Sequence, residues 1–92
     1  MDKTDILNFL AQHKIELKNK YHVSKVGLFG SYAKGTQKRN SDIDIIINGE
    51  KINDEELKLY LEKGLNRKVD IVKKSSLYHF MKYIIDKEAM YV

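Results

Sequence analysis

Three aspartates lie where their carboxylates can act together. Asp42 and Asp44 alternate with isoleucines in the segment 42–47, and Asp70 lies within a second apolar segment, 68–72. Asp is disfavoured inside strands, and alternate strand residues share a face about 6.6 Å apart at Cα. The spacing therefore predicts a carboxylate-bearing sheet face, opposite the face that carries the isoleucines.

Three carboxylates this close would repel one another by about 3 kcal/mol per pair at an effective dielectric of 20. Protonation or bound cations relieve that repulsion. Hard oxygen ligands favour Mg²⁺ or Mn²⁺ over zinc, and a metal pair stabilises both the attacking and the leaving oxygen in phosphoryl chemistry. A plainer interpretation makes Asp42 a strand cap and Asp70 an exposed edge residue. Three carboxylates on one predicted face favour a two-metal catalytic site formed by Asp42, Asp44 and Asp70.

A glycine–serine pair supplies a candidate phosphate site. Gly30 and Ser31 follow the apolar segment 25–29, and Ser31 begins a short predicted helix, 31–34, that Gly35 ends. Such a turn points backbone N–H groups and a hydroxyl at an anion, although an ordinary strand-to-helix turn has the same pattern. A P-loop is excluded because no Lys follows the second glycine, and a dinucleotide fingerprint is absent.

Apolar residues at helical spacing predict four helices. The first covers about residues 4–20, the second residues 31–34, and the third begins with a capping pair of Asn53 and Glu56 and ends at Gly64. The fourth is expected to begin at a cap formed by Ser75 or Ser76. It carries five apolar residues: Leu77, Phe80, Met81, Ile84 and Ile85.

Four strands are predicted between these helices, over residues 25–29, 42–47, 68–72 and 89–92, with Asn48-Gly49 as a turn. Strands alternating with helices predict an α/β fold of the α+β kind, a small mixed β-sheet flanked by helices. The length fits one domain, residues 1–92.

The composition indicates a cytoplasmic protein without disulfides. There is no cysteine, no apolar run of membrane-spanning length, and no pattern of a secretory signal. The net charge is +4, but all but two of the 17 cationic residues are lysine, the exceptions being Arg39 and Arg67. A solvated lysine surface explains most of this charge, and neither membrane binding nor direct nucleic-acid binding is expected.

Other polar and aromatic groups receive a structural interpretation. The three histidines lack the spacing of metal ligands: His13, His22 and His79. Three cations between Gly30-Ser31 and Asp42 are interpreted equally well as solvent-exposed side chains or as contacts to a triphosphate or a partner: Lys34, Lys38 and Arg39. Three aromatic residues at helical spacing are predicted to be core, and would indicate an interface if exposed: Tyr78, Phe80 and Tyr83.

The two motifs together resemble a known signature. Gly30-Ser31, ten residues, and then Asp42-x-Asp44 is similar to the pattern of the polymerase-β-like nucleotidyltransferase superfamily. The fuller string Gly-Ser-Tyr-Ala-Lys-Gly-Thr, followed by Ser-Asp-Ile-Asp-Ile, resembles the minimal nucleotidyltransferases (MNT proteins). The resemblance extends over the whole chain and none of the five core positions departs from it. It implies the nucleotidyltransferase fold and a transferase activity.

The resemblance also implies a role for each core residue. Ser31 and the adjacent backbone would hold the β- and γ-phosphates of a nucleoside triphosphate, with Gly30 allowing close approach. Asp42 and Asp44 would ligate two Mg²⁺ (or Mn²⁺) ions, and Asp70 would join the ion nearest the attacking hydroxyl. The implied reaction is in-line attack on the α-phosphate of ATP with release of pyrophosphate.

Many MNT proteins resemble the antitoxin of a two-gene module whose partner is a HEPN-domain ribonuclease toxin. The implied activity is transfer of AMP from ATP to a tyrosine of that toxin, and a chain of 92 residues leaves little room for a substrate domain of its own. Two alternatives stay open: a binding-only antitoxin that occludes its toxin, and a nucleotidyltransferase acting on a small molecule or nucleic acid. An intact triad argues against the first, and the lack of additional substrate-binding segments against the second.

Overall fold

A computed structural model describes residues 1–92 and contains one mixed, four-stranded sheet. The strands are β1 (Val23–Phe29), β2 (Ile43–Gly49), β3 (Val69–Lys73) and β4 (Met90–Tyr91), in the spatial order β3-β2-β1-β4. β1 is antiparallel to both β2 and β4, whereas β2 and β3 are parallel. The mixed sheet predicted from the sequence is confirmed.

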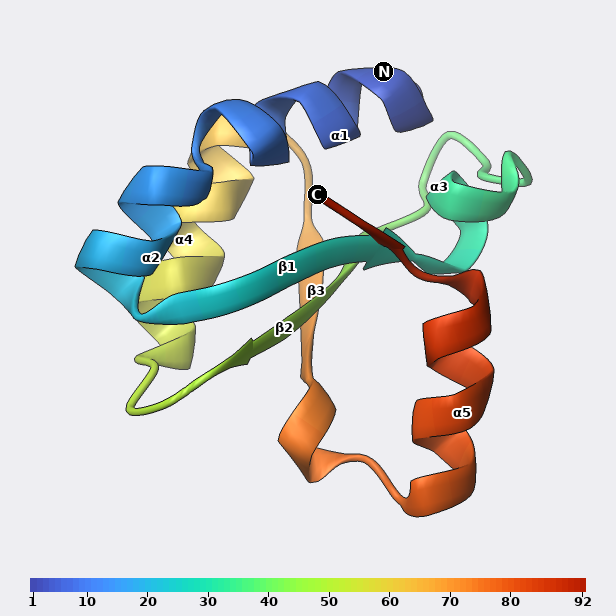
Figure 1. The fold of residues 1–92 in the computed structure, drawn as a ribbon. Coiled ribbons are helices and arrows are strands. Elements are labelled where there is room, and N and C mark those ends of the chain that lie inside the picture. Colours follow the sequence, from blue (N-terminus) through green and yellow to red (C-terminus); the bar gives the residue numbers. More distant parts are fainter.

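Helices lie on both sides of this sheet (Figure 1). One side carries α1 (Lys3–Gln12), α2 (Lys14–Tyr21) and α4 (Asp54–Leu65), and α3 (Gly30–Lys34) follows directly from β1. A short 3₁₀ turn, η1 (Lys74–Ser76), leads from β3 to α5 (His79–Glu88), which lies on the opposite side from α1, α2 and α4.

Strand parity separates the two faces of β2. Ile43, Ile45 and Ile47 belong to the main core, where they pack with buried residues of the helices such as Ile6 and Leu61. Asp44 and Ile46 point to the other face, and Ile46 is fully buried there although it lies outside the main core. The predicted separation of isoleucines from aspartates is confirmed, because side chains of successive strand residues alternate.

Two helices begin with the side-chain caps that their sequences supply. Asp2 and Asp5 form a reciprocal capping box at α1, with both N–H···O distances at 3.0 Å. At α4 the Asn53 side chain accepts a hydrogen bond of 3.2 Å from the N–H of Glu56, which confirms the predicted capping pair.

Two predicted helix boundaries are wrong. The expected helix over residues 4–20 is divided at His13, whose Nδ1 donates to the carbonyl of Phe9 at 2.7 Å. The third helix passes through Gly64 and ends at Leu65, followed by a C-cap at Asn66, which adopts φ +54°. The ring of Phe9 occupies the space beside Gly64, so this glycine serves helix packing and does not end the helix.

Two predicted turns also differ from the structure. Asn48 and Gly49 extend β2, because β1 begins two residues earlier than expected and Val23 pairs with Gly49. Ser75 and Ser76 belong to η1, and Tyr78 occupies the N-cap position of α5 without a side-chain cap. No helix in the structure combines the length and the apolar character needed to cross a bilayer.

Candidate active site

The parallel pairing of β2 and β3 brings two of the predicted aspartates side by side. Asp44 and Asp70 are register partners, and Phe29, the last residue of β1, faces Asp44 from the other neighbouring strand. Asp42 lies two residues before Asp44, immediately outside β2, and is half-buried. The three carboxylates therefore gather where β1 ends and where β2 and β3 begin.

The loop before β2 is held by hydrogen bonds next to Asp42. The Oγ of Ser41 accepts from the N–H of Lys38 at 2.8 Å, and the N–H of Ser41 donates to the carbonyl of Lys38 at 3.1 Å. One residue further on, the N–H of Ile43 donates to the carbonyl of Lys68 at 2.9 Å. These bonds fix the backbone on both sides of Asp42 and join it to the start of β3.

The three carboxylates affect one another electrostatically. Partial burial raises the pKa of Asp44 above its usual value, and the negative charges of Asp70 and then Asp42 raise this pKa further. None of the three side chains accepts a hydrogen bond or forms an ion pair within the protein. The site therefore concentrates negative charge that the chain itself does not neutralise.

This donor set has the chemistry of a site for hard divalent cations. Its ligands are carboxylate oxygens only, the type that Mg²⁺ and Mn²⁺ prefer. The side chains do not surround one point, since no three His, Asp or Glu side chains are grouped as a ready metal site. A cation held between the carboxylates would offset their mutual repulsion.

Two features of the structure favour glycine at position 30. Its φ of +73° lies in the left-handed region. In addition, a β-carbon at this position would lie 2.2 Å from Oδ2 of Asp44. The backbone of Gly30 therefore lies directly against Asp44, so the two motifs recognised separately in the sequence meet in one site.

Ser31 begins the short helix beside this contact. No side chain caps α3, and the hydroxyl of the half-buried Ser31 makes no hydrogen bond within the protein. The helix ends at Gly35, at φ +76°, as its sequence predicts. The first-turn N–H groups and the hydroxyl of Ser31 are therefore donors without a side-chain acceptor at the same sheet edge as the carboxylates.

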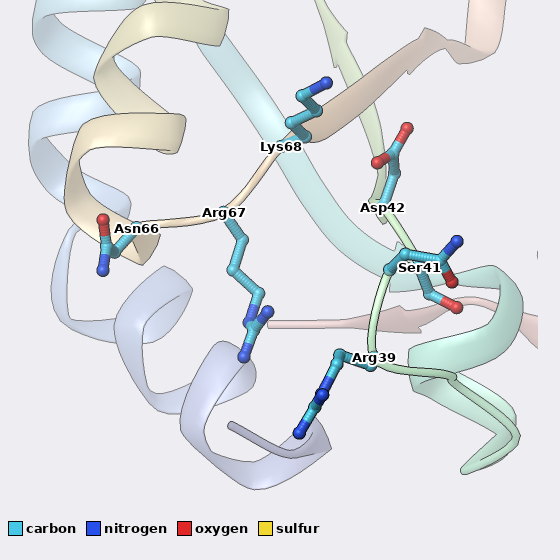
Figure 2. A pocket seen from close by; sticks show the side chains of 7 residues that line it. Arg39, Ser41, Asp42, Asn66, Arg67 and Lys68 are labelled. Carbon is cyan, nitrogen blue, oxygen red and sulfur yellow. The ribbon is translucent and has the colours of Figure 1, made fainter.

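A groove beside Asp42 brings together the only two arginines of the chain (Figure 2). Arg39 comes from the loop before β2 and Arg67 from the loop before β3, and the groove has a volume of about 450 Å³. Its lining is entirely polar: Arg39, Asn40, Ser41, Asp42, Asn66, Arg67 and Lys68. Neither arginine forms an ion pair, so both guanidinium groups are free to meet an anion.

Sequence reasoning missed this arginine pair because it interpreted the cations one at a time. The available signal was that the only two arginines precede the two aspartate-bearing strands. By contrast, the structure gives Lys34 a partner within the fold, an ion pair of 3.1 Å with Glu88 of α5. His13 is likewise occupied, since its ring stacks on Phe9 at 4.1 Å between centroids.

Comparison with known proteins agrees with this geometry. Residues 10–92 match the nucleotidyltransferase domain family. The chain is 42% identical to a protein of Methanocaldococcus jannaschii provisionally named a protein adenylyltransferase, covering 97% of this chain and 96% of that one. It is 39% identical to the protein adenylyltransferase MntA of Thermococcus cleftensis, covering 96% and 93% of the two chains.

Solved structures show the same fold. A structure provisionally described as a minimal nucleotidyltransferase superposes with a TM-score of 0.81 at 29% identity, covering 98% of this chain and 95% of that chain. A toxin–antitoxin structure with AMP-PNP superposes with a TM-score of 0.69 at 27% identity, covering 99% and 72%. Together with the paired motifs at one sheet edge, these matches identify the chain as a minimal nucleotidyltransferase of the nucleotidyltransferase domain family.

Proposed function

We propose that this nucleotidyltransferase is an antitoxin that transfers AMP from ATP to a tyrosine hydroxyl of a HEPN-type toxin, releasing pyrophosphate. The observation that carries the chemistry is the group of three unpaired carboxylates at one sheet edge, of which Asp44 lies against the Gly30 turn. The protein acceptor is supported by relatives named as protein adenylyltransferases and by the toxin–antitoxin structure that contains AMP-PNP. The reaction consumes ATP, and we expect it in the cytoplasm.

In this proposal each residue acts from its place on the sheet edge. The hydroxyl of Ser31 and the N–H groups that begin α3 donate hydrogen bonds to the β- and γ-phosphates. Asp42, Asp44 and Asp70 hold divalent cations, which when bound would neutralise charge on the phosphates and favour deprotonation of the acceptor hydroxyl. The barrier falls through positioning and electrostatic stabilisation, without a covalent enzyme intermediate.

The strand order suggests how the two substrates are arranged. The Gly30 turn ends β1, Asp44 lies on the neighbouring β2, and Asp70 lies on β3 beyond it. With the triphosphate tail at Ser31, the space next to β3 remains available for the acceptor hydroxyl. In-line attack requires that the leaving pyrophosphate and the attacking oxygen stand on opposite sides of the α-phosphate.

The test is co-expression with a HEPN-type candidate partner, sought among the products of adjacent genes and here termed the neighbour, followed by mass spectrometry of that protein. Adenylyl additions on a tyrosine are expected with the wild type and with Glu50→Ala, a substitution of an exposed residue outside the site. They should disappear with Asp44→Ala, whose fold is checked by circular dichroism.

Each competing function gives a different result in the same experiment. A neighbour left unmodified by the wild type, with Asp44→Ala still protecting cells in full, would show that the protein neutralises its toxin by occlusion. Transfer of labelled AMP to a small molecule or to RNA, and not to the neighbour, would assign the chain to another branch of the superfamily.

A further inference from the structure

Helix α5 presents an unusually apolar surface to solvent. Phe80, Tyr83 and Ile84 follow one another at the i, i+3, i+4 spacing of a single helix face. Their exposed fractions are 65%, 63% and 51%, and Tyr78 at the N-cap of the helix is 75% exposed. We call these four residues the α5 outer face. The prediction that Tyr78, Phe80 and Tyr83 are core residues is therefore wrong.

The fold leaves this face uncovered because α5 is the only long helix on its side of the sheet (Figure 1). Ile85 is the one residue of α5 that is buried. The other side of the sheet carries three helices and holds the main core. An apolar helix face without a neighbouring element marks an interaction surface when it forms a contiguous patch.

The α5 outer face belongs to the same side of the molecule as the candidate active site. Asp44 and Ile46 share one face of β2, and their register partners Asp70 and Val72 share that face of β3. This is the face opposite the main core, the side on which α5 lies. A protein seated on α5 would therefore approach the carboxylates without having to pass around the sheet.

Polar contacts hold α5 in this place. Lys34 of α3 pairs with Glu88 at 3.1 Å, and Lys74 pairs with Asp86 at 3.1 Å. Asp86 also accepts a hydrogen bond of 2.8 Å from the hydroxyl of Tyr91. The helix is thus fixed to α3, the element that follows the Gly30 turn, and its exposed face has a defined position relative to the site.

The charges on α5 identify the kind of partner. Both acidic residues of the helix, Asp86 and Glu88, are used in these internal ion pairs, so its remaining charges are the cations Lys82 and Lys87. Two copies of the chain meeting symmetrically through α5 would bring like charges together. A partner with an apolar surface bordered by carboxylates would complement both the aromatic stripe and the lysines.

We propose that the α5 outer face is the docking surface for the protein acceptor, a protein that presents an apolar patch with an acidic border. This inference rests on the proposed function, because it takes the acceptor to be a protein. Three aromatic residues and an isoleucine can bury on the order of 500 Å², a large part of the roughly 800 Å² that each partner contributes to a standard interface. Contacts around the active site would supply the remainder.

The test separates docking from transfer by measuring binding without ATP. Asp44→Ala protein is titrated in a calorimeter with the same candidate partner, the neighbour, first without a further substitution and then with Phe80→Glu or Tyr83→Glu added. Each added glutamate should weaken binding at least tenfold. The matched control is Leu59→Glu, at an exposed leucine of α4 on the opposite side of the sheet (68% exposed), which should change the affinity less than twofold.

The outcomes distinguish the two proposals. Loss of binding with Phe80→Glu supports the docking surface even if no AMP transfer is ever detected. The docking surface would be overturned if the wild type transfers AMP to the neighbour and Phe80→Glu leaves the affinity of the Asp44→Ala protein for the neighbour unchanged. The proposed function would then remain intact. Docking at α5 is also overturned if Phe80→Glu dissociates a homodimer seen by light scattering, or if Asp44→Ala protein without a further substitution fails to bind the neighbour.

Discussion

The backbone of Gly30 lies against the carboxylate of Asp44, so closely that a β-carbon on residue 30 would be 2.2 Å from Oδ2. This contact joins the turn proposed to bind the triphosphate to the aspartate proposed to hold the metals. Any side chain at position 30 would have to displace Asp44 or move the turn. The contact therefore couples the proposed phosphate site to the proposed metal site. A substitution in either one should change binding at the other.

Gly30→Ala should greatly slow transfer, and Gly35→Ala is its matched control. Both glycines have positive φ, +73° and +76°, but a β-carbon at Gly35 would meet nothing within 4 Å. Left-handed backbone costs an alanine roughly 1–2 kcal/mol at either position, and Gly30→Ala adds the collision with Asp44. We expect transfer to fall at least about 100-fold in Gly30→Ala and by less than threefold in Gly35→Ala. Equal activities of the two variants would show that the contact has no catalytic importance.

Asp44→Asn should stabilise the metal-free protein at neutral pH. Because folding raises the pKa of Asp44 above 3.8, the folded protein binds this proton more tightly than the unfolded chain does. The resulting stability is fully present below the unfolded pKa and is lost as the pH rises through the folded pKa. At pH 7 in EDTA, Tm should therefore rise by a few degrees in Asp44→Asn, and the difference should shrink near pH 3.

The control for this measurement is Asp54→Asn, because Asp54 pairs with Lys73 at 3.0 Å and its substitution removes a favourable contact. Asp54→Asn should leave Tm unchanged or slightly lower at pH 7. Addition of Mg²⁺ should raise the Tm of the wild type more than that of Asp44→Asn, since a ligand stabilises the state that binds it. Equal magnesium shifts in both proteins would contradict metal binding by Asp44.

Replacing the arginine pair should weaken use of an anionic substrate. Arg39 and Arg67 share a groove with Asp42 and have no ion-pair partner, so their positive potential reaches the site. The double variant Arg39→Gln/Arg67→Gln should lower kcat/KM about 5–10-fold at low ionic strength, and the difference should narrow as salt screens the charges. The double variant Lys14→Gln/Lys18→Gln, which removes two exposed cations of α2, serves as the control for net charge alone. An equal loss in both proteins would contradict a local role of the groove.

Tyr91→Phe should loosen the attachment of the C-terminus and α5. The Tyr91 ring packs on Gly27, where a β-carbon would lie 2.8 Å from Cδ1 of the ring, and its hydroxyl donates to Asp86. Hydrogen bonds from Tyr91 and then from Lys74 lower the pKa of Asp86, so this stability is present above pH 3.8 and is lost as the pH falls through the folded pKa. The variant should have a Tm a few degrees lower at pH 7, with the difference fading towards pH 2. A Tm difference independent of pH would assign the effect to packing alone.

Much of the site was readable from the sequence because local rules govern it. Alternation of side chains along a strand places Asp44 on the sheet face opposite to Ile43 and Ile45. Gly35 ends α3 because glycine readily adopts the left-handed backbone of a helix C-terminus. These features depend on residues a few positions apart. The predicted helix boundaries were wrong where a residue distant in the sequence packs on the helix. Phe9 packs on Gly64, for example, and α4 continues past this glycine to Leu65.

Only the tertiary structure decided which segments meet. Strand pairing set the register that puts Asp44 beside Asp70, and two loops far apart in the chain brought Arg39 and Arg67 into one groove. The exposure of Phe80 and Tyr83 is also a tertiary result, since their helical spacing fits a core as well as an interface. The sequence alone determined the chemical groups and the sheet face they occupy, because those follow from residue type and strand period. Which of these groups lie next to one another depends on contacts between distant segments, which no local pattern encodes.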